Sequence, residues 1–184
     1  INTVNVIPAI DRNIFVEWNV CNQDKMNKIF DEADHIVDLS LKNQRIVTNP
    51  MEPRGLIAEW DMSNDFYTLY GSTQNIHVMR NSISDMLGVS NESIRFIAPD
   101  VGGGFGAKNF CYTEYGLIAW ASKKIQRPVK WIASRSEGFL SDHQGRDHQS
   151  ESCLALRKDG KILALHVKSY ANLGAYMVGS AGGV

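Results

Sequence analysis

The chain lacks the cysteine patterns that mark several classes of metalloprotein. Among its 184 residues are only three cysteines, Cys21, Cys111 and Cys153, which stand far apart and form no Cys-x-x-Cys pair. The sequence therefore contains neither a zinc ribbon nor the cysteine ligands of an iron–sulfur cluster. Free thiols in a reducing cytoplasm are the expected state of all three.

Long apolar runs and an excess of one charge are also missing. No run of about 18 apolar residues occurs, so no transmembrane helix is expected, and the first residues lack the charged and apolar regions of a signal peptide. Lys and Arg number 19 against 20 Asp and Glu, which gives no basic surplus for nucleic acid. With 43% hydrophobic residues, the composition is that of a globular protein. We expect a cytoplasmic protein that binds neither nucleic acid nor a membrane.

The spacing of apolar residues predicts an α+β fold, with a mixed sheet and two main helices. Expected helices cover 23–33, 75–87 and 113–124, and Gly88 stands where a helix C-cap requires glycine. Expected strands cover 14–20, 35–41, 56–61, 66–70, 94–98 and 129–133, followed by a hairpin of 150–156 with 162–171. A polar, loop-rich stretch is expected at 134–147, with Ser134 capping a loop. His143, His148, Asp142 and Asp147 are interpreted as solvated loop residues, because their spacing matches no metal site.

A glycine loop between an expected strand and an expected helix is the most informative segment. Residues 102–106 contain four glycines in five positions. Because glycine loses much conformational freedom on folding, such a run indicates that the backbone must remain bare there. Amides without neighbouring Cβ atoms can approach an anionic or polar ligand closely.

The residues alone leave several interpretations of this loop open. Gly102-x-Gly104-x-x-Ala107 satisfies a permissive dinucleotide-binding pattern, but no acidic residue follows about 20 positions later at the end of a second strand. A phosphate-binding Walker loop needs Gly-Lys-Ser/Thr, where this chain has Ala107, Lys108 and Asn109. A tight turn that lets a helix pack on a strand is the purely structural interpretation.

A family resemblance offers a further interpretation. The segment from Asp100 to Lys108 resembles the G-G-G-F-G-x-K loop of the superfamily of xanthine dehydrogenase, aldehyde oxidase and carbon monoxide dehydrogenase. Other segments resemble that family in the same order: Pro50-Met51-Glu52-Pro53-Arg54, Ser72-Thr73-Gln74-Asn75, Met86-Leu87-Gly88, Arg127-Pro128-Val129-Lys130 and Asn172-Leu173-Gly174-Ala175-Tyr176. The chain is identified as a fragment of a molybdopterin-binding large subunit, with a leading segment at 1–32 and a partial domain at 33–184.

The resemblance implies an oxidoreductase that hydroxylates an aldehyde or an N-heterocycle with water. It implies molybdenum held by molybdopterin, in the cytosine dinucleotide form if the source is bacterial, with FAD and 2Fe–2S clusters on partner subunits or domains. Gln74 is the counterpart of the family glutamine that lies beside the molybdenum oxo group, and it would not be a direct ligand of the metal. Gly103, Gly104, Phe105 and Gly106 would contact the cofactor, with Phe105 adding an apolar wall.

Two departures from the family pattern argue against a purine substrate and against a molybdenum–copper site. Purine-oxidising members carry glutamate just after the loop lysine, where this chain has Asn109. The carbon monoxide enzymes carry a copper-binding cysteine after residues like Gly-Ala-Tyr, where this chain has Met177, Val178 and Gly179. The family's general-base glutamate lies further downstream, so no catalytic residue is expected here and the isolated fragment would be inactive.

Self-association of the chain through uncovered apolar surface is expected. A non-catalytic module of the same fold and a nucleotide-binding domain are the alternatives.

Overall fold

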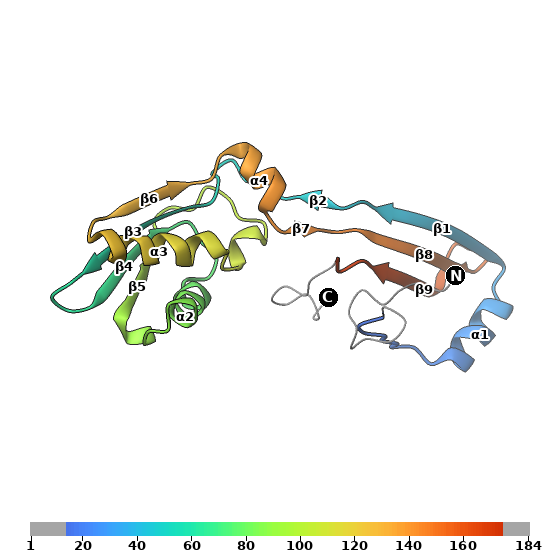
Figure 1. Ribbon diagram of the computed structural model, residues 1–184. Helices are drawn as coiled ribbons and strands as arrows, with labels where there is room; N and C mark the ends of the chain where they lie inside the picture. The colour runs from blue at the N-terminus through green and yellow to red at the C-terminus, as the bar shows by residue number, and fades with distance from the viewer. Residues whose placement is uncertain (1–13, 175–184) are drawn as a thin grey trace, which may run out of the picture. The chain divides into compact units, whose positions relative to one another are not determined.

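The computed structural model describes residues 14–174 and divides the chain into two compact units (Figure 1). One unit is built from Ile1–Ile46 together with Arg146–Val184, and the other is Val47–Gly145. The described residues form helices together with strands in separate, largely antiparallel sheets, which confirms the expected α+β class. Within the described residues, no helix combines the length and apolar character needed to cross a membrane.

The unit Val47–Gly145 contains a four-stranded mixed sheet in the order β5-β4-β3-β6. Its strands are β3 (Gly55–Asp61), β4 (Phe66–Gly71), β5 (Ile94–Ile97) and β6 (Val129–Ile132). β3 pairs antiparallel with β4 and β6, whereas β4 and β5 are parallel. The parallel pair requires a crossover connection, which the first of two long helices supplies.

Both long helices of this unit cover the same face of the sheet (Figure 1). Alternate residues of the strands are buried, as expected when one face of a sheet meets the core and the other meets solvent. α2 (Ile76–Leu87) and α3 (Thr113–Ile125) pack their apolar residues against that face. The shared core consists of Leu56, Ala58, Tyr67, Leu69, Met79, Ile83, Ile94, Phe96, Tyr112, Tyr115 and Ala119.

α2 ends in the way its sequence predicts. The Asn75 side chain caps its start by accepting from the Val78 amide, and Gly88 ends it in the left-handed region with φ 66. A Cβ built on Gly88 would meet nothing within 4 Å. The need for glycine at this position is therefore conformational rather than steric.

Gly88→Ala is expected to lower the free energy of unfolding by about 1–2 kcal/mol, the cost of left-handed backbone for an L-residue. Gly145→Ala is the matched control, because a Cβ there also meets open space and Gly145 has no positive φ. Urea unfolding of both variants checks the prediction. Equal stability of the two would show that α2 does not end on this left-handed residue.

The stretch expected to be a polar loop at 134–147 contains a helix, so that prediction was wrong. α4 (Arg135–Ser141) begins at a capping box, in which Ser134 Oγ accepts from the Glu137 amide and Glu137 Oε2 accepts from the Ser134 amide. These reciprocal bonds satisfy amides that otherwise lack partners at a helix start. The Ser-x-x-Glu spacing was the available signal. Two short 3-10 turns, η2 (Asn91–Ser93) and η3 (Ala107–Asn109), complete the helical segments of the unit.

The other unit is a three-stranded antiparallel sheet in the order β1-β8-β9. Its elements are α1 (Gln23–Asp31), β1 (His35–Asn43), β8 (His148–Leu156) and β9 (Ile162–Ala171). The expected strand at 14–20 was wrong: that segment is irregular and exposed, and pairs with no strand in the described part of the chain. Two short strands, β2 (Ile46–Val47) and β7 (Gln144–Gly145), pair where the chain passes between units.

Candidate functional site

The glycine loop follows β5 and adopts backbone angles that favour glycine. Gly103 and Gly106 have φ values of 94 and 93, and Phe105 has a positive φ of 50. The Phe105 side chain is 73% exposed. The loop closes in η3, where the Ala107 amide donates to the Gly104 carbonyl. Left-handed residues in a turn can direct neighbouring backbone N–H groups toward one anion, as in anion-binding nests.

The structure brings Gln74 against this loop. Its Oε1 accepts hydrogen bonds from the Gly106 amide at 2.9 Å and the Lys108 amide at 3.3 Å. A Cβ on Gly104 would lie only 2.4 Å from the same Oε1. Glycine at position 104 is therefore what lets the Gln74 side chain approach the loop backbone.

Several hydrogen-bond donors of this site remain without a partner inside the described residues. With Oε1 of Gln74 accepting two amides, the amide nitrogen Nε2 is left as a donor. The backbone N–H groups of Gly103, Gly104 and Phe105 also donate to no group within residues 14–174. Gln74 and Phe105 are exposed, so this set of N–H groups is accessible and can donate to a ligand rich in oxygen or negative charge.

Glu52 and Lys108 contact this site, although no role was predicted for either residue from the sequence. Glu52 Oε2 accepts hydrogen bonds from Ser72 Oγ at 2.6 Å, Gly102 N at 2.7 Å and Lys108 Nζ at 2.7 Å. Burial raises the pKa of Glu52, but the hydrogen bonds from Lys108, Ser72 and Gly102 outweigh it and the pKa is lowered. The carboxylate is therefore ionised at neutral pH and balances the fully buried Lys108 ammonium.

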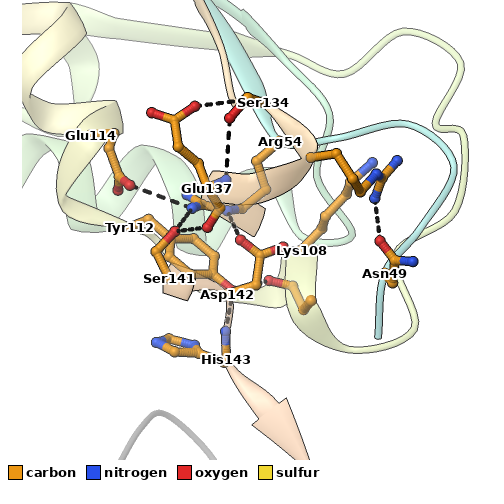
Figure 2. A network of polar contacts seen from close by, with 12 residues as sticks. Asn49, Arg54, Lys108, Tyr112, Glu114, Ser134, Glu137, Ser141, Asp142 and His143 are labelled. Carbon is orange, nitrogen blue, oxygen red and sulfur yellow. Dashed lines mark hydrogen bonds and ion pairs between the residues drawn. The ribbon is translucent and has the colours of Figure 1, made fainter. Parts of the chain in front are cut away.

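Arg54, two residues further on, is the centre of a second polar network (Figure 2). Its guanidinium, 1% exposed, donates to Asp142 Oδ1 at 2.6 Å and Ser141 Oγ at 2.9 Å, and lies 3.7 Å from the Tyr112 ring centroid. Glu114 Oε1 accepts a further bond at 3.4 Å. The arginine thus links the segment before β3 to α3 and to the end of α4.

The prediction that Asp142 and His143 are solvated was wrong. The Asp142 side chain is 6% exposed in its ion pair with Arg54. His143 stacks on Tyr112 with ring centroids 4.6 Å apart, and burial, followed by the charge of Arg54, lowers its pKa. Asp147 pairs with Arg45 at 3.2 Å, in the other unit. Among the described residues, no group of His, Cys, Asp and Glu could hold a metal ion.

A family model described as "Molybdopterin cofactor-binding domain" matches residues 7–183. The chain belongs to this family of molybdopterin cofactor-binding domains. The match leaves the dinucleotide-binding and Walker interpretations of the glycine loop without support.

Two relatives of this molybdopterin-binding chain are named as the large chain or the large subunit of an enzyme. It is 32% identical over 169 residues to the carbon monoxide dehydrogenase large chain of Hydrogenophaga pseudoflava, covering 92% of this chain and 21% of that one. It is 31% identical over 151 residues to the nicotine 6-hydroxylase large subunit of Paenarthrobacter nicotinovorans, covering 82% and 18%. The chain therefore spans about a fifth of the length of these relatives.

Solved structures of related enzymes have a similar fold. Quinoline 2-oxidoreductase from Pseudomonas putida 86 matches with a TM-score of 0.75 and 32% identity, over 82% of this chain and 19% of that one. Carbon monoxide dehydrogenase from Oligotropha carboxidovorans matches with a TM-score of 0.71 and 33% identity, over 82% and 19%. Both the fold and the family resemblance expected from the sequence are confirmed.

Proposed function

We propose that this chain forms part of the molybdenum cofactor site of an enzyme that hydroxylates an aldehyde or an N-heterocycle with water. The observation that carries the proposal is the pairing of Gln74 with the glycine loop. Its carbonyl oxygen is bound by two loop amides, so its Nε2 and the amides of 103–105 are the donors left for a ligand. When bound, the cofactor supplies the redox chemistry of substrate oxidation.

The residues of this chain bind and orient the cofactor. Gln74, as a neutral amide, donates a hydrogen bond near the metal without altering the charge of the centre. Gly103, Gly104, Phe105 and Gly106 line the same site, with backbone N–H groups of the first three available as donors. Phe105, exposed at the loop, supplies the apolar wall. The general base comes from a glutamate elsewhere in the enzyme.

The substrate class is proposed from the departures in sequence and from the names of relatives. Asn109 replaces the glutamate of purine-oxidising members, and the relatives include a nicotine 6-hydroxylase and the indole-3-acetaldehyde oxidase of Zea mays. Met177, Val178 and Gly179, on which the expectation against a molybdenum–copper site depends, lie outside the described residues.

The assembly of the enzyme is also proposed from the names of relatives. We propose FAD and 2Fe–2S clusters on partner subunits or domains, since the relatives are named as large chains or large subunits. We also propose the cytosine dinucleotide form of the cofactor if the source is bacterial, and a cytoplasmic location. Within the chain, we propose a leading segment at 1–32 before a partial domain at 33–184, and self-association of the isolated chain.

Metal and pterin analysis of protein from the native organism tests this function, together with its intact mass. Molybdenum and pterin in equal amounts, on a polypeptide much longer than this chain, are the expected result, with turnover of an aldehyde or N-heterocycle. Copper beside molybdenum would redirect the substrate to carbon monoxide. Absence of molybdenum from the purified native protein would refute the proposal and favour a non-catalytic module of the same fold.

A further inference from the structure

One carboxylate, that of Glu52, holds both ends of the glycine loop. Its Oε2 accepts from the Gly102 amide, where the loop begins, and from Lys108 Nζ, where it ends. The Glu52 amide also donates to the Gly102 carbonyl at 3.3 Å. A Cβ on Gly102 would lie 2.5 Å from Cβ of Glu52, so the absence of a side chain at 102 permits this contact.

Lys108 extends this restraint to Gln74. The Lys108 carbonyl accepts hydrogen bonds from Thr73 Oγ1 at 2.9 Å and from the backbone N–H of Gln74 at 3.1 Å. The backbone N–H of Lys108 donates to the side-chain Oε1 of Gln74. Its ammonium group is fully buried and has Glu52 as its ion-pair partner. Because a buried charge without its partner is strongly unfavourable, the side chain and backbone of Lys108 would move if Glu52 were neutral.

We propose that Glu52 and Lys108 are a positioning pair that fixes the orientation of the Gln74 amide toward the cofactor. Neither residue is a catalytic residue; they act through the Lys108 backbone, which contacts Gln74 on both its main chain and its side chain. The chemistry of the pair suits this role, because a charge-assisted hydrogen bond is shorter and stronger than a neutral one. The inference rests on the proposed function of Gln74 and deepens it.

The test compares variants of the assembled holoenzyme by the Mo(V) electron paramagnetic resonance signal, kcat and KM. Glu52→Gln and Lys108→Met are expected to shift the signal in the same direction as Gln74→Ala. We expect kcat to fall by about 10- to 100-fold, the usual effect of losing a residue that orients a group at a metal site, with a smaller change in KM. Glu137→Gln is the matched control and is expected to leave the Mo(V) signal unchanged. The Glu137 carboxylate also accepts a hydrogen bond from a backbone N–H, but that bond only caps α4.

Glu52→Asp keeps the test decisive if the neutral variants fail to fold. The shorter side chain leaves the charge beside Lys108 but cannot reach Ser72, Gly102 and Lys108 together, so a folded protein with a shifted signal is expected. Hydrogen exchange of residues 72–75 and 102–109 in cofactor-free protein gives a readout independent of the metal. Faster hydrogen exchange of these residues in Glu52→Asp than in Glu137→Gln would support the positioning role of Glu52 and Lys108.

The outcomes separate this inference from the proposed function. A wild-type enzyme without molybdenum refutes the function, whereas the hydrogen-exchange comparison still tests the pair. If Gln74→Ala changes the Mo(V) signal while folded Glu52→Asp and Lys108→Met leave the signal, kcat and exchange unchanged, the positioning role is overturned and the function stands.

Discussion

Replacing Arg54 with methionine is expected to lower the free energy of unfolding by about 3–5 kcal/mol, the cost of breaking a buried ion pair on one side. Methionine keeps much of the arginine volume, but Asp142, 6% exposed, loses its partner at 2.6 Å. Ser141 loses a second bond at 2.9 Å. Urea unfolding followed by tryptophan fluorescence measures the effect, since Trp131 lies 5.4 Å from the guanidinium.

Two further variants assign the loss to the uncompensated charge. Arg54→Met with Asp142→Asn removes that charge and is expected to recover part of the stability, because the two residues interact directly. Arg135→Met removes an exposed arginine that bonds the Met51 carbonyl at 2.8 Å, and is expected to cost at most about 1 kcal/mol. Equal losses from Arg54→Met and Arg135→Met would contradict the burial-based argument.

Much of the fold could be predicted because local signals agreed with tertiary structure. The alternation in β3 and β4, the helical spacing of Met79 and Ile83, and Gly88 at the end of α2 each reflect the core that they form. The strand expected at 14–20 was wrong because its apolar residues lack a partner in the described structure: Trp18 is 77% exposed. Apolar spacing alone does not show whether a partner strand exists.

The candidate site could be predicted only in part. The glycine loop and Gln74 belong to sequence motifs, and the structure places them in contact. Glu52 and Arg54 stood in a quoted motif, yet their partners Lys108 and Asp142 lie 56 and 88 residues away. Separations of that size are set by the sheet and its helices, so no local spacing rule identifies such pairs. Charged residues near prolines or in a polar loop are usually solvated, which made the wrong interpretation of Asp142 the natural one.

Gly104→Ala is expected to reduce turnover of the assembled enzyme by about 100-fold or more, through displacement of a residue that orients the reacting centre. The added Cβ would lie 2.4 Å from Oε1 of Gln74, which is a steric clash that forces one of the two groups to move. Gln74 must then rotate away and lose the hydrogen bonds from Gly106 and Lys108. The rate of enzyme reduction by the identified substrate measures the loss. Gly138→Ala in α4 is the control, because its Cβ would meet Asp142 at an ordinary 3.6 Å.

A double variant decides whether the Gly104 effect passes through Gln74. If it does, Gly104→Ala combined with Gln74→Ala reduces turnover no further than Gln74→Ala alone, because the clashing side chain is already absent. Multiplied losses in the double variant would mean instead that the Cβ itself obstructs the cofactor. In either case the site requires a residue without a side chain at position 104. Only a double variant with no further loss of turnover would mean that Gly104 acts by allowing the position of the Gln74 side-chain amide.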